Sequence, residues 1–323
     1  MRTDSSRSTR SAAIDADIAG ETVLVTGGAG FVGSHIARAL VRDNEVRVLD
    51  DLSTGQPRNV PDGATLYEGD LLDESVLREA IDGVDIVFHQ AGLVSVPKSV
   101  ERPAESNRVN VAGTLAVLDA ARAVDARVVL ASSVAIYGDP EVVPIDESHP
   151  TRPTSPYATD KLAIDHYARV YHELYGLETV ALRYFNVYGP GQSAGNYAGV
   201  VSTFLEQARS GQALTVDGDG SQTRDFVHVA DVVRANLAAA TTAHVGEAFN
   251  IGTGDSVTIR ELAELITDVA GTTAGIVHTD PRVGDVERSR ADISKARRLL
   301  DFEPSVELTT GLGELARRRN LAR

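Results

Sequence analysis

The stretch TVLVTGGAGFVG, residues 22–33, decides the fold of this chain. Its first five residues form a short apolar run rich in β-branched side chains, which predicts a buried strand. Gly27, Gly30 and Gly33 follow with the spacing GxxGxxG, and apolar periodicity predicts a helix over about 31–41. Glycines between a strand and a helix allow a tight turn, close approach of backbone to a pyrophosphate, and close helix–strand packing. The stretch therefore predicts the first βα turn of a dinucleotide-binding domain.

Strand-like and helix-like segments alternate after this turn. Apolar runs predict strands at 45–49, 65–67, 85–89, 127–131 and 179–182, and periodic segments predict helices at 73–81, 107–123 and 157–175. Strands that alternate with helices of this length indicate a parallel sheet with right-handed crossovers. We expect an α/β fold with a doubly wound, Rossmann-like parallel sheet.

An acidic residue stands where such a domain binds ribose. Asp50 ends the second predicted strand, 17 residues after Gly33. A carboxylate there accepts hydrogen bonds from ribose hydroxyls and repels a 2′-phosphate, which favours NAD over NADP. Asp70 ends the third strand and either receives the adenine amine or caps a loop. Ala91 and Gly92 are small enough to let the cofactor pass close to the backbone.

A tyrosine and a lysine one helical turn apart supply candidate chemistry. Tyr157 and Lys161 share a helix face, and a cation beside a phenol favours the phenolate, so we expect a lowered Tyr157 pKa and a proton acceptor. The chain has only three lysines, at 98, 161 and 295. Ser133 ends the fifth strand, at the carboxyl edge where ligands bind in open α/β sheets, and could hold a substrate oxygen. No GxSxG sequence surrounds it, which argues against a nucleophilic serine hydrolase.

The expected cofactor-binding set combines these positions. Asn110, on the helix over 107–123, is included with the alternative that it is a buried structural amide. The full set is Gly27, Gly30, Phe31, Val32, Gly33, Asp50, Asp51, Asp70, Leu71, Ala91, Gly92, Asn110, Tyr157 and Lys161.

The remainder of the chain predicts a second lobe. We expect residues 21–185 to form the NAD-binding domain, with 226–251 returning to it as a helix and a strand. The smaller C-terminal lobe, which binds the substrate, is expected from 186–225 and 252–323, where the strand–helix pattern is looser. Helices are expected within it at 259–270, at 293–300 and near 309–319. Residues 1–20 have little apolar periodicity and are expected to be a mobile tail.

Composition excludes several classes of function. The chain has no cysteine, so disulfides and thiolate metal sites are impossible, and its eight histidines show no metal-binding spacing. The net charge of −15 argues against binding to nucleic acid or anionic lipid and fits either a solubilising or a halophilic surface. No apolar run approaches the roughly 20 residues that cross a bilayer, and no secretory signal opens the chain. We expect a cytoplasmic protein.

Together these motifs resemble a known family. The glycine turn, Ser133 and the Tyr157-xxx-Lys161 pair are similar to those of the extended short-chain dehydrogenases/reductases, and more closely to the NAD-dependent nucleotide-sugar epimerases and dehydratases. The resemblance runs from about residue 21 to 316. It also includes HQAG (89–92), NVAGT (110–114), RYFNVYGP (183–190), RDFVHVAD (224–231) and FNIG (249–252).

The resemblance implies a substrate and an assembly. Asn186 would hold the sugar diphosphate, Arg224 and Arg282 would neutralise its charge, and Asp285 would receive a ribose hydroxyl of the substrate nucleotide. Arginine suits this task because its planar fork binds phosphate oxygens in pairs. Ser133, Tyr157 and Lys161 would be catalytic. By the same analogy the helices over 107–123 and 157–175 would pair in a homodimer.

The residues after Ser133 reduce the number of family reactions that fit this sequence. The 4,6-dehydratases of the family carry Asp-Glu after the catalytic Ser or Thr, and the uronate decarboxylases carry a glutamate at the second of these positions. This chain has Val134-Ala135. We therefore expect a 4-epimerase acting on a nucleotide sugar, most simply UDP-glucose and UDP-galactose. The alternatives are a dehydratase or 4-reductase with unusual acid and base residues, or a non-catalytic NAD-sensing protein.

Overall fold

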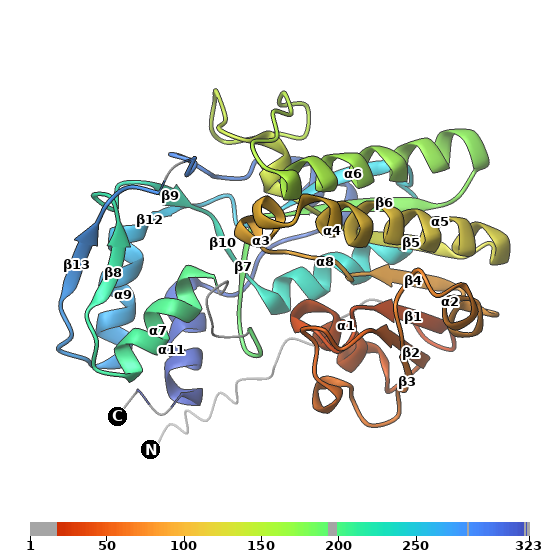
Figure 1. Ribbon diagram of the computed structural model, residues 1–323, viewed down its shortest axis with the longest axis horizontal. Helices are drawn as coiled ribbons and strands as arrows, with labels where there is room; N and C mark the ends of the chain where they lie inside the picture. Colours follow the sequence, from red (N-terminus) through yellow and green to blue (C-terminus); the bar gives the residue numbers. More distant parts are fainter. Residues whose placement is uncertain (1–17, 193–198, 283, 320, 322–323) are drawn as a thin grey trace, which may run out of the picture.

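A seven-stranded parallel sheet forms the centre of the protein. The computed structural model describes residues 18–192, 199–282, 284–319 and 321. The strand order is β11-β6-β5-β4-β1-β2-β3, so the direction of winding changes between β1 and β4 (Figure 1). This arrangement confirms the expected doubly wound α/β fold. The strands are β1 (Thr22–Thr26), β2 (Glu45–Asp50), β3 (Thr65–Glu68), β4 (Ile86–His89), β5 (Arg127–Ser133), β6 (Thr179–Tyr184) and β11 (Glu247–Ile251).

Helices cover both faces of this sheet. One face packs against α1 (Phe31–Leu40), α8 (Val229–Thr241) and α10 (Ser294–Leu300), and the other against α2 (Glu74–Ile81), α5 (Gly113–Val124) and α6 (Pro156–Tyr175). Successive strand residues contribute to opposite faces. Val23 and Val25 belong to the core beneath α1, whereas Leu24 belongs to the core beneath α5 and α6. Burial on both faces requires a continuous apolar run, which is why residues 22–26 could be recognised as a strand.

A smaller lobe stands beside the sheet, at the left of Figure 1. Phe204, Leu262 and Leu312 are buried in its apolar core. The chain enters this lobe after β6, returns to the sheet with α8 and β11, and leaves again. The elements of the lobe are α7 (Val200–Arg209), α9 (Ile259–Ala270), α11 (Leu308–Arg318) and the pair β8 (Leu214–Asp217) and β13 (Ile276–Thr279). The limits expected for the two domains stay a prediction.

Two short strand pairs connect the lobe with the sheet. β7 (Asn186–Tyr188) pairs with β10 (Phe226–His228), and β9 (Thr223–Arg224) pairs with β12 (Val257–Thr258). Asp225 lies between β9 and β10 and is fully buried. Its carboxylate accepts hydrogen bonds from the backbone of Thr253 at 2.8 Å, Gly254 at 3.0 Å and Ala291 at 3.1 Å. The charged side chain therefore fastens three segments at the junction.

The segment expected as one helix over 107–123 is divided in the structure. α4 (Pro103–Asn107) leads into a π-helical turn, η2 (Arg108–Ala112), and α5 follows it. A π turn inserts an extra residue into the helical ladder and is frequent at functional sites. Three further short helices were not predicted, namely η1 (Pro57–Asn59), α3 (Val96–Glu101) and η3 (Val134–Tyr137).

The N-terminal segment joins the fold earlier than expected. Ile18 is buried in the core beneath α1, and its carbonyl accepts a hydrogen bond of 2.9 Å from the Asn44 side chain. The backbone of Gly20 donates to that of Asp43 at 2.8 Å. Residues 18–20 are therefore part of the domain, which corrects the expected limit of the tail, and residues 1–17 lie outside the described part. In that described part, no helix is long and apolar enough to cross a membrane.

Candidate active site

The glycine turn is shaped by close contact with the end of β4. Gly27 has a φ of +67°, and a Cβ added there would lie 2.7 Å from the backbone nitrogen of Ala91. A Cβ on Gly33 would collide with the carbonyl oxygen of Gly27. Side chains are therefore excluded at both positions. Gly27 and Ala91 are more than sixty residues apart in the sequence, and both were expected to bind the cofactor. The structure brings them into contact.

The start of α1 is open to an anionic ligand. The helix begins at Phe31 and continues through Val32 and Gly33, and no side chain caps its N-terminus at Gly30. The first backbone N–H groups of a helix have no partner within the helix and carry the positive end of its dipole. This arrangement fits a phosphate group, as the glycine spacing predicted.

Asp50 lies against the same turn. Its Oδ2 accepts a hydrogen bond from the Ala29 backbone at 2.9 Å and its Oδ1 accepts one from Leu52 at 2.9 Å. Burial raises the pKa of the Asp50 carboxyl above its usual value, although these two bonds act in the opposite direction. The adjacent Asp51 is exposed, and its carboxylate binds the backbone and hydroxyl of Ser53. Asp50 is thus the carboxylate held in a fixed position at this strand end.

Two other expected cofactor positions have partners within the protein. Asp70 accepts from the Leu72 backbone at 3.0 Å and pairs with Arg108 at 2.7 Å, and these contacts, the Leu72 bond first, lower the pKa of its carboxyl. Leu71 is buried against the sheet. Asn110, in the π turn, binds the backbone nitrogen of Leu93 through Oδ1 at 2.8 Å and its carbonyl through Nδ2 at 3.1 Å. The structural alternative for Asn110 therefore has support, and its contact with a cofactor stays a prediction.

Gly92 lies where the π turn and α6 approach the end of β4. A Cβ on Gly92 would lie 2.9 Å from Asn110 Oδ1 and 3.7 Å from the Lys161 ammonium. The expected positions Gly92, Asn110 and Lys161 are thus neighbours in space.

Ser133, Tyr157 and Lys161 meet at the carboxyl edge of the sheet. Ser133 is the last residue of β5, and its hydroxyl lies near enough to the Tyr157 phenol to oppose the effect of burial on the pKa of that phenol. Ser155 caps α6 and Pro156 is its first residue, so Tyr157 lies in the first turn of the helix. All three expected catalytic side chains are buried. The structure brings them together as the sequence predicted.

Lys161 binds the sheet rather than the phenol. Its ammonium donates to the Ala131 carbonyl at 2.8 Å and lies 6.0 Å from the centroid of the Tyr157 ring. Burial raises the pKa of the Tyr157 phenol, and the nearby Ser133 hydroxyl opposes that change. The expectation of a lowered Tyr157 pKa is therefore wrong for the protein alone, because loss of hydration outweighs the effect of the nearby groups.

Burial also changes two basic groups at this site. It lowers the pKa of Lys161 to about 8, although the charge of Asp160 acts in the opposite direction. It lowers the pKa of His89 to about 3, with a further contribution from Lys161, so this imidazole is neutral. His89 bridges the hydroxyls of Thr26 at 2.7 Å and Thr114 at 2.8 Å. Sequence reasoning did not assign His89 a role, because an isolated histidine at a strand end carries no spacing signal.

The expected substrate residues form a second group. Arg224 donates to Asp285 at 2.5 Å and to the Val286 carbonyl at 2.6 Å, and only 13% of its side chain is exposed. Arg282 is 69% exposed and pairs with Asp217 at 3.1 Å. Burial lowers the pKa of Arg224. The charge of Asp285 opposes this change, and the charge of Arg282 adds to it.

Asn186 offers an unused polar atom. It begins β7, and its buried side-chain oxygen has no hydrogen-bond partner among the described residues. A buried acceptor without a partner is rare in folded proteins, and a bound ligand is one way to satisfy it.

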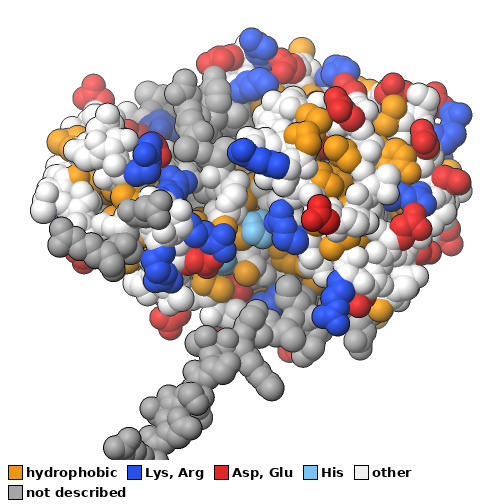
Figure 2. All heavy atoms as spheres, turned by 90° about the horizontal axis from the view of Figure 1, so that it is seen from below, with side chains coloured by type: hydrophobic (Ala, Val, Ile, Leu, Met, Phe, Trp, Pro, Cys, Tyr) orange, Lys and Arg blue, Asp and Glu red, His pale blue; other side chains and the backbone are white. Residues whose placement is uncertain are grey.

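The acidic composition does not exclude local positive charge on the surface. Lys and Arg side chains gather near the middle of the face shown in Figure 2, although the net charge of the chain is −15. In the described part of the chain, no group of three or more His, Asp or Glu residues is arranged to hold a metal.

A doubly wound sheet with an uncapped glycine turn, a buried carboxylate after its second strand, and a Ser–Tyr–Lys group defines a dinucleotide-dependent enzyme class. A model of the NAD dependent epimerase/dehydratase family matches residues 23–252. The chain belongs to this family, and it is an NAD-dependent enzyme.

Relatives of the chain support this assignment. The UDP-glucose 4-epimerase of Mycolicibacterium smegmatis is 37% identical over 300 residues, which cover 90% of this chain and 96% of the relative. A solved UDP-N-acetylglucosamine 4-epimerase from Methanobrevibacter ruminantium is 37% identical with a TM-score of 0.90, and 93% of this chain and 98% of that one are covered. A Thermus thermophilus UDP-glucose 4-epimerase solved with NAD is 39% identical with a TM-score of 0.85, with coverage of 93% and 99%.

The lowered pKa of Lys161 gives a prediction for stability. Between about 8 and the ordinary value of 10.5, the unfolded chain binds more protons at this lysine than the folded chain, so its contribution to stability rises with pH. The unfolding free energy of the cofactor-stripped wild type, minus that of Lys161→Met, should increase from about pH 7 to about pH 9.5. Denaturant titrations at each pH measure this difference. Lys98→Met, which removes a lysine nearer the surface, is the control, and an equal trend there would contradict the assignment.

Proposed function

We propose that this enzyme interconverts UDP-glucose and UDP-galactose by epimerisation at C4. One observation carries the proposal: Ser133, Tyr157 and Lys161 meet beside the glycine turn, without a further acid–base pair after Ser133. The turn η3 presents Val134 and Ala135 at the positions where dehydratases would need Asp and Glu. The Ala135 backbone instead donates to the Ser133 hydroxyl at 3.2 Å, which orients that hydroxyl. A site with one proton acceptor suits a reaction that only removes and restores a proton at one hydroxyl.

Each side chain then has a defined task. Ser133 binds the O4 hydroxyl of the sugar, and Tyr157 accepts its proton and later returns it. Lys161 contributes positive charge that favours the phenolate when the site is filled. NAD, which the glycine turn and Asp50 would hold, would supply the hydride-transfer chemistry needed at C4. The protein's own contribution is to exclude water, orient the hydroxyl and move one proton.

The second group of residues binds the nucleotide diphosphate. Arg224 is held by two backbone carbonyls, of Thr223 and Val286, so its fork is already ordered before a ligand arrives. Asp285 lies next to it and would bind a hydroxyl of the substrate ribose. Arg282 is more exposed and adds charge from the surface. The unpaired Asn186 oxygen is an acceptor, so it would bind a hydroxyl of the substrate, whereas the Asn186 Nδ2 group would donate to a diphosphate oxygen.

The phenol of Tyr157 gives the first test of this function. Tyr157→Phe should lower kcat by about 10³-fold, because general acid–base catalysis contributes factors of 10²–10⁴. NAD content should stay unchanged, since the ring is retained. NMR of UDP-glucose converted to UDP-galactose, without added NADH, measures the reaction. Tyr175→Phe, at an exposed tyrosine, is the control.

The same assay separates the alternatives. An NAD-loaded wild type that leaves UDP-glucose, UDP-galactose and UDP-N-acetylglucosamine all unchanged would refute the substrate. Accumulation of a 4-keto sugar would instead show a dehydratase or a 4-reductase.

The difference in burial between the two arginines gives a second test. Arg224→Gln should raise KM for the UDP-sugar by about 10- to 100-fold, since a charge-assisted bond contributes roughly 1.5–3 kcal/mol. Arg282→Gln should raise it by less than about 5-fold, because exposed ion pairs contribute little. Initial rates over a range of substrate concentrations decide this, and equal effects at the two positions would contradict the assignment.

The outer face of α6 supports a homodimer. Ala163, Tyr167, Val170 and Leu174 follow helical spacing on the side away from the sheet, and Leu174 is 69% exposed. Such an apolar stripe is typical of a helix that pairs with another. Light scattering should give the mass of a dimer for the wild type and of a monomer for Tyr167→Asp/Leu174→Asp. Val277→Asp, at an exposed valine of β13, should stay dimeric, and a monomeric wild type would end this proposal.

A further inference from the structure

Arg183 and Asp165 form a buried ion pair close to the Ser–Tyr–Lys group. Arg183 on β6 donates through Nε to Asp165 Oδ2 at 2.9 Å and through Nη2 to Oδ1 at 2.8 Å. Their side chains are only 10% and 4% exposed. A buried pair loses the hydration of both ions, so it is weak evidence for stability and better attested as a device that fixes a particular arrangement.

Asp165 connects the two elements that carry the catalytic candidates. It lies on the buried face of α6, one helical turn beyond Lys161 and two beyond Tyr157. The hydroxyl of Ser132 donates to Asp165 Oδ2 at 2.7 Å, and Ser132 directly precedes Ser133 on β5. The carboxylate therefore ties the strand of the serine to the helix of the tyrosine and lysine.

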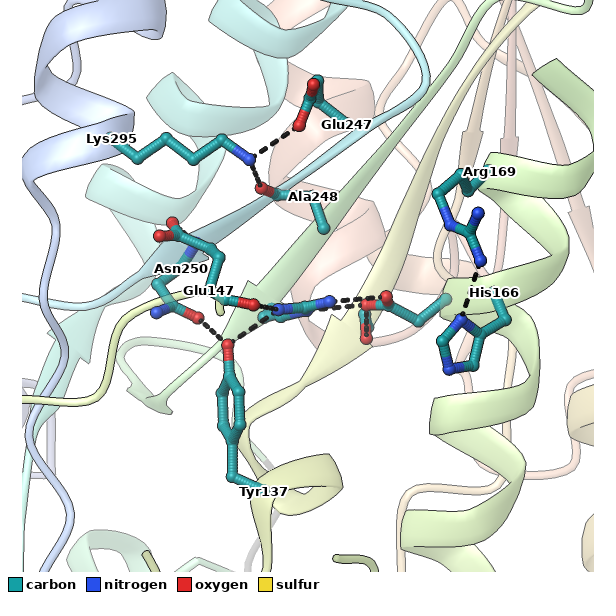
Figure 3. Close-up of polar contacts among 11 residues, drawn as sticks. Tyr137, Glu147, His166, Arg169, Glu247, Ala248, Asn250 and Lys295 are labelled. Atoms are coloured by element: carbon teal, nitrogen blue, oxygen red, sulfur yellow. Dashed lines mark hydrogen bonds and ion pairs between the residues drawn. The ribbon is translucent and has the colours of Figure 1, made fainter. Parts of the chain in front are cut away.

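Arg183 extends the connection to the turn after Ser133. Its Nη1 donates to the Tyr137 phenol at 2.9 Å and to the Glu147 carbonyl at 2.9 Å. Tyr137 ends η3, is fully buried, and donates in turn to Asn250 Oδ1 on β11 at 2.8 Å. Figure 3 shows Tyr137, Glu147 and Asn250 converging from three separate segments. One guanidinium thus holds η3 and the loop after it against the sheet.

The hydrogen bonds continue to the segment that holds the diphosphate-binding arginine. Asn250 Nδ2 donates to the Ile145 carbonyl at 2.9 Å, and the Ile145 backbone accepts from Asp292 and donates to Arg290, each at 2.8 Å. A few residues earlier in the same segment, the Val286 carbonyl accepts from Arg224 at 2.6 Å. A continuous chain of contacts therefore joins β5 and α6 to the second lobe.

We propose that Arg183 and Asp165 are positioning residues for catalysis. They fix the position of α6 relative to β5. The position of α6 in turn determines how Tyr157 lies against Ser133. They also hold the turn after Ser133 in register with the segment around Arg224. The kinetic consequence of this inference rests on the proposed function.

The charge of the pair dictates how it is tested. Loss of one partner would leave a buried charge unpaired, which destabilises a protein strongly. The double variant Asp165→Asn/Arg183→Gln removes both charges and keeps polar groups in both places. Its matched control is Arg169→Gln/Glu173→Gln, which removes an arginine–carboxylate pair from the exposed side of the same helix.

The experiment uses the full-length, NAD-loaded enzyme and two readouts. The first is kcat and KM per NAD-containing site. The double variant should lose about 10- to 100-fold in kcat, with a smaller change in KM, because misplacement by about an ångström costs rates of this order. The second is the titration of Tyr157, measured by tyrosinate absorbance as the difference between each protein and its Tyr157→Phe counterpart. It should shift to higher pH, because the contact with Ser133 is weakened. The control variant should match the wild type in both.

The outcomes are separable. A folded, NAD-loaded double variant with wild-type kcat and an unchanged Tyr157 titration overturns the inference. If the wild type itself catalyses no epimerisation, the proposed function fails, whereas the titration still decides the positioning role. If the double variant does not fold, Ser132→Ala and Tyr137→Phe replace it, since each removes hydrogen bonds without leaving a charge unpaired. Each should lower kcat by at least about 5-fold, and no loss in either would overturn the inference.

Discussion

The inner face of α6 carries two buried side chains of opposite charge, Lys161 and Asp165. Each needs a partner on the sheet, and this need fixes the position of the helix. Ile164 and Ala168 pack on the sheet, but apolar contacts alone tolerate small shifts of a helix. The charges of Lys161 and Asp165 do not tolerate such shifts, because an unpaired buried ion costs several kcal/mol. Their partners are the Ala131 carbonyl on β5 and Arg183 on the adjacent β6. Apolar burial supplies the free energy of folding, and the charges select one position of the helix among many.

Local signals explain how much of this architecture could be predicted from the sequence. The helix over 259–270 was predicted with the bounds that the structure shows, because Thr258 and Glu261 form a capping box at its start and Gly271 ends it. The glycine turn and the Tyr157–Lys161 spacing are equally local. By contrast, the π turn over 108–112 accompanies a long-range contact between the Asn110 amide and Leu93, and no periodicity announces it.

The candidate site shows the same division between position and environment. The sequence placed Ser133 and Tyr157 near one another, because the end of a parallel strand and the start of the next helix share one edge of the sheet. It predicted the wrong direction for the Tyr157 pKa, because that pKa depends on burial by the whole fold. It also did not predict that Asp285 would bind Arg224 from 61 residues away. A sequence pattern shows which residues are neighbours along one helix or strand. The hydration of a side chain and its long-range partners depend on the folded molecule.

Because α8 and β11 return to the sheet after part of the second lobe, the sheet domain is not synthesised as one continuous segment. β11 completes the edge beside β6, and Val232 and Ala235 of α8 cover the same core as β1. Both elements leave the ribosome after the first part of the second lobe. A nascent chain that ends before them has an unpaired β6 edge and uncovered valines on one face. The sheet therefore lacks its edge strand and one covering helix until residue 251 has been synthesised, and such non-local contacts favour slow completion of folding and exposure to aggregation before that point.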